Sequence, residues 1–351
     1  MRFFMIGIAV LSPPDLAEPN MQKETTMTPL RSLLLIVLLT VFCVTPPHVY
    51  SDEPPRLAGK VYTTSWYGGE ICVVDTETWT ESKRIPVGVH AHNIYLSPDK
   101  RFAWVTNNNS GTVSVIDTAT DKVVQSVKVG KGPRHTFFSP DGSEAYVTNE
   151  FDATVSVIDP KTYKEVAVLT VGKMPHFPIV VKDKLFVTNF GNGHTCVFSR
   201  PNREKLMCLI VGDGPLGAGA TKDGKLVVVA CHLSNHVAVI DTDKMQVVAH
   251  VATDPGPVQV SVTPDQRFAY VANDGVGSVQ KIDLASNKVV KTIAISKDAG
   301  THGISFAADG KLLLITNTGV STLSVIDTEK DEVIKTIKVA TSPEGIAFLK
   351  K

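Results

Sequence analysis

Short runs of β-branched residues alternate with polar turns along most of the chain. "VSVID" at 113–117 and again at 155–159, and "KVVKTIAIS" at 288–296, are typical of these runs, and Asp-Gly, Asn or Pro turns separate them. Runs of four to seven residues rich in Val and Ile predict β-strands. Residues 57–351 show no segment with helical periodicity. The pattern therefore predicts an all-β protein.

The strands recur in a fixed order with a period of about 42 residues. Counted from the "VTN" strand, the first strand of successive repeats ends at Asn107, Asn149, Asn189, Cys231, Asn273 and Asn317. Four short strands in each repeat of this length are typical of a propeller blade. The first repeat lacks its innermost strand, and the unpaired strand "PEGIAFLKK" (343–351) supplies it. We therefore predict a single seven-bladed β-propeller over residues 52–351, closed by a blade made from both termini, which leaves no open sheet edge there.

The wording of the repeat resembles a known family. "VSVIDT" (113–118), "SPDG" (139–142) and "YVTN" (146–149) are similar to the repeats of YVTN-type seven-bladed β-propellers, which are common among secreted bacterial and archaeal proteins. The resemblance covers nearly all of residues 57–351. It implies the fold and leaves the activity open, because propellers carry many functions.

The N-terminal segment 1–51 does not share the repeat. Arg31, the apolar run "LLLIVLLTVFCV" (33–44) and the small residue Ser51 have the form of a secretory signal peptide, with Met27 a more natural start than Met1. The run is too short to span a bilayer. We expect a mature chain from about Asp52, exported to the periplasm or secreted, without a transmembrane anchor; an uncleaved anchor is the alternative.

Bulk charge excludes some partners. The 35 Lys and Arg residues balance the 35 Asp and Glu residues, so no global field attracts nucleic acid. We expect a monomer whose ligand is held locally.

Residues that recur in every blade serve the scaffold, and residues that vary at one repeat position point to a site. Asp117 and its equivalents precede a turn and are expected to bond its backbone. The second residue of the innermost strand varies instead. Around the ring it is His302, Glu344, His92, Arg134, His176, Leu216 and Val258.

Eight histidines fall in segments that open on one face of the propeller, which we call the top face. The predicted ligand-binding residues on this face are His90, His92, Arg134, His135, Glu150, His176, His232, His302 and Glu344. The alternative is a set of channel-mouth residues bonded to water and loop carbonyls.

The first functional hypothesis is a transition metal or a haem-type cofactor, because neutral imidazole is the commonest metal ligand. The predicted metal ligands are His90, His92, His176 and His302. The Cα atoms of the last three are expected to lie far apart across the channel, and Cys231 could face the channel as a thiolate ligand. The repeats are also similar, at the level of fold, to propellers that carry the d-type haem of nitrite reductases. That resemblance implies that Arg134 could bind an acidic side chain of the macrocycle.

The second hypothesis is catalytic. "GPRH" (132–135) with "NE" (149–150), and "HAH" (90–92), resemble motifs of the lactonase propellers. The resemblance implies that His90 or His92, Arg134 and Glu150 form a site for an anionic lactone, where arginine binds the anionic group and Glu or His moves a proton. Those enzymes have a further arginine after a later strand, where this chain has Phe190, His232 or Asp274.

The third hypothesis is a binding module for a protein or a cell-envelope polymer on the same face. The residues alone leave open which of the three applies and whether the protein is an enzyme.

Cys196 and Cys208 lie in the second and third strands of one repeat, on either side of the turn "RPNRE" (200–204). Their midpoint is the middle of that turn, so an antiparallel hairpin places them directly opposite. An exported protein folds under oxidising conditions, which favours a Cys196–Cys208 disulfide. The alternative is a pair of buried free thiols.

Overall fold

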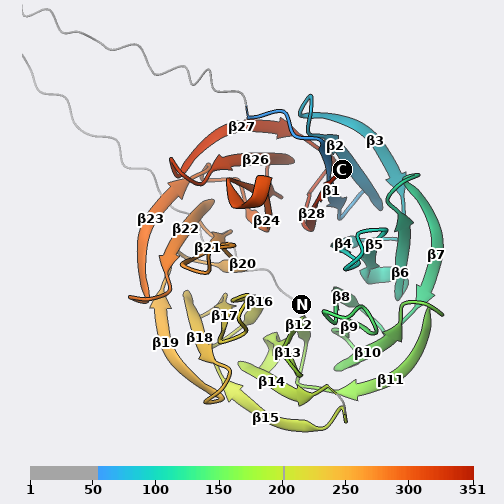
Figure 1. Ribbon diagram of the computed structural model, residues 1–351, viewed down its shortest axis with the longest axis vertical. Helices are drawn as coiled ribbons and strands as arrows, with labels where there is room; N and C mark the ends of the chain where they lie inside the picture. Colours follow the sequence, from blue (N-terminus) through green and yellow to red (C-terminus); the bar gives the residue numbers. More distant parts are fainter. Residues whose placement is uncertain (1–53, 201) are drawn as a thin grey trace, which may run out of the picture. The chain divides into compact units, whose positions relative to one another are not determined.

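The described part of the computed structural model, residues 54–200 and 202–351, consists of seven four-stranded antiparallel sheets arranged in a ring (Figure 1). This confirms the predicted seven-bladed propeller. The predicted signal peptide and upstream extension, residues 1–51, lie outside the described residues. No helix among the described residues has the length and apolar character needed to cross a membrane.

Each blade runs from an innermost strand at the channel to an outermost strand at the rim. Blade 1 contains β28 (Ile346–Lys350), β1 (Gly59–Ser65), β2 (Glu70–Asp75) and β3 (Thr80–Pro86). Blade 2 contains β4 (Ala91–Leu96), β5 (Phe102–Asn107), β6 (Thr112–Asp117) and β7 (Lys122–Lys128). Blade 3 contains β8 (Pro133–Phe138), β9 (Ala145–Asn149), β10 (Thr154–Asp159) and β11 (Lys164–Thr170). Blade 4 contains β12 (Pro175–Val181), β13 (Lys184–Asn189), β14 (His194–Ser199) and β15 (Lys205–Ile210).

The remaining blades follow the same order. Blade 5 contains β16 (Pro215–Ala220), β17 (Leu226–Cys231), β18 (His236–Asp241) and β19 (Gln246–Ala252). Blade 6 contains β20 (Pro257–Val262), β21 (Phe268–Asn273), β22 (Ser278–Asp283) and β23 (Lys288–Ala294). Blade 7 contains β24 (Thr301–Ala307), β25 (Leu312–Asn317), β26 (Thr322–Asp327) and β27 (Glu332–Lys338). Three short 3₁₀ helices, η1 (Asn108–Ser110), η2 (Phe190–Asn192) and η3 (Ala308–Gly310), lie in connections.

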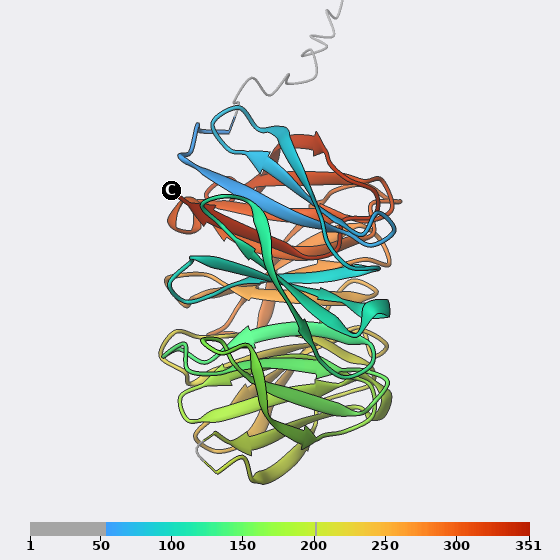
Figure 2. The same ribbon diagram turned by 90° about the vertical axis from the view of Figure 1, so that its right-hand side faces the viewer.

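The first and last strands of the described chain meet in blade 1. β28 pairs antiparallel with β1, with Val61 opposite Phe348 and Thr63 opposite Ile346. Figure 2 shows these blue and red strands side by side. The predicted closing strand is therefore present, although its paired part is shorter than the expected 343–351.

The core lies between neighbouring blades, because the inner three strands of each sheet are buried on both faces. Trp104 from blade 2 packs with Phe138 and Ile158 from blade 3, for example, and all three side chains are buried. The outermost strands expose most of their residues. This distribution explains the near-continuous apolar runs of the inner strands.

The recurrent Asp and "SPDG" residues hold turns, as predicted. Asp117 Oδ1 accepts hydrogen bonds from the backbone N–H groups of Ala119 and Thr120 at 3.0 and 2.9 Å. In the "SPDG" turn, Ser139 Oγ donates to Asp141 Oδ1 at 2.5 Å. These side chains belong to the scaffold.

Candidate metal centre

A β-bulge near the start of the innermost strand interrupts the pairing at the residues of the site. In blade 2, Ala91 pairs with Asn107, and pairing resumes only at Ile94 with Val105. The same shift occurs in blade 3 between Pro133 and Thr136. Two successive residues are thereby released from regular pairing, and a bulge of this kind can re-aim side chains. In blade 2 both of these residues, His92 and Asn93, line the central cavity.

The threonine of the "VTN" repeat holds this bulge in place. Thr106 Oγ1 accepts the N–H of Asn93 at 3.0 Å and donates to the carbonyl oxygen of Arg134 on the next blade at 2.6 Å. Thr148 makes the equivalent bonds to the His135 N–H and to the His176 carbonyl. The recurrent threonine therefore connects each bulge to the innermost strand of the next blade. Blades 5 and 6 have Ala230 and Ala272 at the position of this threonine. In blade 6 the repeat position of Arg134 is occupied by the apolar Val258.

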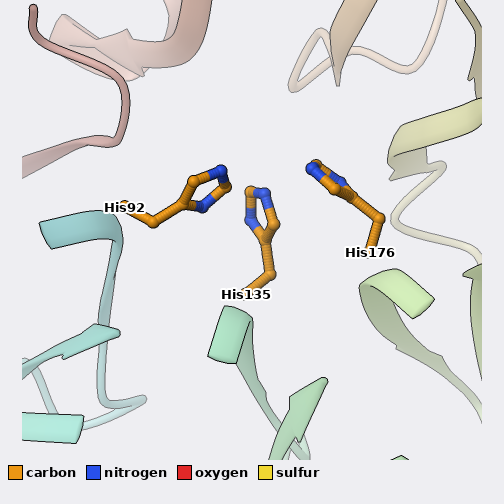
Figure 3. Close-up of side chains that lie close together, drawn as sticks. All are labelled: His92, His135 and His176. Carbon is orange, nitrogen blue, oxygen red and sulfur yellow. The ribbon is translucent and has the colours of Figure 1, made fainter. Parts of the chain in front are cut away.

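Three imidazoles from blades 2, 3 and 4 converge at the channel. The ring centroids of His92, His135 and His176 are 4.7–5.6 Å apart, and each residue offers a ring nitrogen that lies within 4.8 Å of the other two. Figure 3 shows the three rings pointing toward one another. Their exposed fractions are 2, 1 and 6%. We call these residues the three-histidine set.

The ring of His92 lies close to those of His176 and His302, although the Cα atoms of these residues are expected to lie far apart across the channel. His92 is 5.6 Å from His176 and 6.1 Å from His302 between ring centroids. The imidazole side chains extend into the channel and bring their rings together there.

Burial keeps the three-histidine set neutral. Desolvation lowers the pKa values of His92, His135 and His176 well below their usual value, and the nearby Arg134 charge lowers them further. His92 Nδ1 lies 3.0 Å from the Arg134 carbonyl oxygen. When Nδ1–H donates to this oxygen, the Nε2 lone pair is left available. His135 Nδ1 and His176 Nδ1 have no hydrogen-bond partner among the described residues.

His92 also belongs to a second group, which we call the carboxylate set, with His302 and Glu344. Ligand atoms of the three residues lie within 4.8 Å of one another, and His92 Nε2 is 3.5 Å from Glu344 Oε2. Burial lowers the pKa of His302 to about 4 and raises the pKa of the Glu344 carboxyl to about 8. Glu344 Oε2 and His302 Nδ1 have no hydrogen-bond partner among the described residues.

Arg134 and Glu150 form an ion pair at the mouth of the channel. Arg134 Nε donates to Glu150 Oε2 at 2.5 Å, and the guanidinium carbon lies 5.7 Å from the centre of the Trp66 ring. His90 stacks on the same Trp66 ring with centroids 4.6 Å apart. His90 was predicted as a metal ligand, but within residues 54–200 and 202–351 it belongs to neither of the two ligand sets. His135 takes part instead.

Other predicted residues lie outside both sets. His232 Nδ1 is 3.9 Å from Asp274 Oδ1. Cys231 does not offer a thiolate to the channel, which corrects that hypothesis. Its side chain is fully buried, the thiol donates to the Val211 carbonyl at 3.3 Å, and burial raises its pKa to about 12.

Cys196 and Cys208 stand directly opposite in β14 and β15, and their sulfurs are bonded at 1.97 Å. This disulfide lies within blade 4 between its two outer strands, so it stabilises the blade and contributes no ligand to the channel.

Below the imidazoles the channel holds a cavity of about 280 Å³. His92, His135, His302 and Glu344 line its polar part, and apolar side chains such as Phe137, Phe177 and Ile304 line the rest. Desolvation by burial disfavours the charged forms of the ionisable groups that line it.

Sequence reasoning missed Trp66 and Gln259. Gln259 Nε2 lies 3.5 Å from His135 Nε2 across the channel. The available signal was its repeat position, because Gln259 is the third residue of its innermost strand, as His135 is in blade 3. Trp66 directly follows β1 at the repeat position that Glu150 occupies after β9, so that position was the available signal.

The fold and the buried histidines define a seven-bladed β-propeller with a polar centre on its axis. The chain belongs to the family described as "Lactonase, 7-bladed beta-propeller", whose sequence profile matches residues 71–248. The profile described as "Cytochrome D1 heme domain" matches residues 220–345. A search among curated proteins finds no match to the chain.

Solved structures show the same fold at low sequence identity. A chain of hydrazine synthase from Kuenenia stuttgartiensis is 20% identical, with a TM-score of 0.68 over 74% of this chain and 95% of that chain. A functionally unknown protein from Desulfotomaculum acetoxidans is 16% identical, with a TM-score of 0.73 over 83% and 99%. The dihydro-heme d1 dehydrogenase NirN, in complex with DHE, is 15% identical, with a TM-score of 0.64 over 85% and 76%.

Proposed function

We propose that this protein is an exported propeller that binds a transition-metal ion through His92, His135 and His176 at the mouth of its central channel. The observation that carries the proposal is the convergence of three neutral imidazoles with ring nitrogens within 4.8 Å of one another. Imidazole nitrogens suit Zn²⁺, Cu²⁺, Ni²⁺ and iron. A small closing movement of the side chains would bring the nitrogens to the shorter distances of a bound ion.

The surroundings of His92 support this proposal. Histidines that bind metals usually donate their second ring N–H to a carbonyl or a carboxylate, which fixes the ring orientation. His92 Nδ1 has such a partner in the Arg134 carbonyl. Among the described residues, the buried Nδ1 atoms of His135 and His176 have no partner, which is costly unless something binds them.

A haem-type cofactor fits these residues less well. The cavity of about 280 Å³ is below the range of about 300–1,000 Å³ that is usual for pockets of drug-sized ligands. Arg134, the residue expected to bind an acidic side chain of the macrocycle, is already paired with Glu150. We therefore assign no step to a haem-type group.

Two features support export. Residues 31–51 have the form of a signal peptide, and disulfides such as Cys196–Cys208 persist mainly in oxidising compartments.

Metal analysis of the mature chain, residues 52–351, tests the proposal. We expect about one Zn²⁺ ion for each chain in calorimetric titration, and loss of this binding in His135→Ala. His250→Ala is the matched control, because His250 lies in the outer strand β19. Absence of zinc and copper binding by the folded wild-type protein, or a Soret band in protein from its native host, would contradict the proposal.

A lactonase-like activity is the second candidate, because the family profile covers His92, Arg134 and Glu150. Arg134 would bind the anionic group of a lactone, and Glu150 or His92 would accept a proton from the attacking water. Ring opening that persists in EDTA and disappears in Arg134→Ala would favour this candidate over metal binding.

A further inference from the structure

His92 is shared by two different ligand sets. It meets His135 and His176 in the three-histidine set, and His302 and Glu344 in the carboxylate set. Its Nδ1 faces the Arg134 carbonyl, so Nε2 is the nitrogen left for a metal. One nitrogen lone pair binds one ion. The two sets therefore define alternative positions and cannot both use His92 at the same time.

The two positions differ in chemistry. Three imidazoles form a nitrogen site that suits Zn²⁺ and Cu²⁺, while carboxylate oxygen suits Mn²⁺. Two histidines and one carboxylate are also the ligands of many non-haem Fe²⁺ sites. The residue types therefore distinguish the ions that each position prefers.

Backbone packing brings the carboxylate set close to His92. Glycine follows both His302 and Glu344, and a Cβ atom on Gly303 would lie 2.1 Å from the Glu344 carbonyl oxygen. A Cβ on Gly345 would lie 2.7 Å from Asn93 Cα, and the Gly345 N–H donates to the His92 carbonyl at 3.0 Å. Only glycine permits this approach of blades 7, 1 and 2, which places Glu344 beside His92.

Glu344 has no hydrogen-bond partner among the described residues that accounts for its position. Its Oε2 is buried, the neutral His92 Nε2 lies 3.5 Å away, and the Arg134 guanidinium is bonded to Glu150 instead. A buried carboxyl without a partner is costly. A cation between His92, His302 and Glu344 would satisfy it.

We propose that the channel mouth has two alternative metal positions that share His92, a nitrogen position at His135 and His176 for Zn²⁺ and a carboxylate position at His302 and Glu344 for Mn²⁺. The inference rests on the proposed function, because it assumes that these imidazoles bind metal.

The test measures Zn²⁺ binding by calorimetry and Mn²⁺ binding by electron paramagnetic resonance in the mature protein. We expect Glu344→Gln to weaken Mn²⁺ binding by about tenfold or more and to leave Zn²⁺ binding nearly unchanged. His176→Ala should do the reverse. Zn²⁺ should displace Mn²⁺ from the wild-type protein, and His92→Ala should weaken both.

Three results would overturn the inference: equal effects of both variants on both ions, no effect of Glu344→Gln on Mn²⁺, or simultaneous binding of one Zn²⁺ and one Mn²⁺. If Glu344→Gln does not fold, as judged by circular dichroism, His302→Gln tests the same position. Failure of the proposed function is distinguishable, because the wild-type protein would then bind neither ion.

Discussion

His92 Nδ1 and Thr106 Oγ1 both lie within hydrogen-bond distance of one acceptor, the carbonyl oxygen of Arg134, at 3.0 and 2.6 Å. A carbonyl oxygen has two lone pairs and can accept both. The orientation of the His92 ring in blade 2 therefore depends on the backbone of blade 3. The same threonine that repeats around the ring as scaffold also positions the first ligand of the candidate centre.

Thr106→Val should weaken both the fold and the site. It leaves the buried Asn93 N–H without its partner and removes one donor from the Arg134 carbonyl, at a cost of about 1–3 kcal/mol. Urea unfolding measures this loss, and calorimetry with Zn²⁺ should show weaker binding. Thr170→Val, on the exposed strand β11, is the matched control. Unchanged stability in Thr106→Val would show that the hydrogen bonds of Thr106 to Asn93 and Arg134 do not stabilise the bulge.

The ring should depend on its last strand. A chain without residues 343–351 loses β28, its pairing with β1, and the buried side chains of Ile346 and Leu349. We expect a much lower melting temperature or no folding, measured by circular dichroism. Removal of Lys351 alone is the control. An unchanged melting temperature for the longer deletion would refute closure by β28.

Site and scaffold residues should separate in mutants. His92→Ala should impair Zn²⁺ binding and Arg134→Ala should impair binding of an anionic ligand, each with little change in melting temperature, because these side chains lie at the channel mouth outside the cores between blades. Asp117→Ala should lower the melting temperature and leave Zn²⁺ binding unchanged, since it removes the bonds to the turn at Ala119 and Thr120. Equal losses of stability in all three variants would show that His92 and Arg134 serve the scaffold, as Asp117 does.

The four cysteines of residues 54–351 should give two reactive thiols. Denatured, unreduced mature protein should show Cys72 and Cys231 only, because Cys196 and Cys208 are bonded. In the native protein, burial raises the pKa of Cys72 to about 11 and that of Cys231 to about 12, so alkylation at pH 8 should be slow. Mass spectrometry after iodoacetamide treatment measures both states. Four thiols in the denatured protein would exclude the disulfide.

The metal-free protein should lose stability as the pH falls below about 6.5. The pKa values of His92, His135, His176 and His302 are lowered in the folded state, so the unfolded chain binds more protons below the ordinary histidine value of 6.5. The stabilising contribution of these groups is present above pH 6.5 and is lost as the pH falls toward the folded values. Glu344 has the opposite sign. Its pKa is raised to about 8, so its contribution is lost as the pH rises through that value.

Urea unfolding in EDTA at pH 7 and pH 5 measures this dependence. His135→Gln should reduce the difference between the two pH values, because one buried group that resists protonation is removed. Glu344→Gln removes the opposing contribution of Glu344, so a Glu344→Gln protein that is equally stable at both pH values would show that the imidazoles are hydrated in the folded state.

The fold could be predicted from the sequence because it depends on local, repeated patterns. Short, near-continuous apolar runs recur in each blade, Asp117-type turns and "VTN" strand ends recur in most blades, and each acts within one blade or between neighbours. The same repetition separated scaffold from site, since Arg134, His92, His176 and His302 occupy one repeat position that varies.

The composition of the candidate centre was decided only by the tertiary structure. A regular strand points successive residues to opposite faces. In blade 3 the bulge releases Arg134 and His135 from regular pairing, and His135 joins His92 in the three-histidine set. His90, two residues before His92, stacks on Trp66 instead. Which imidazoles meet depends on the channel width and on side-chain direction across blades that are distant in the chain. These quantities are set by the closed ring as a whole, and no single repeat encodes them.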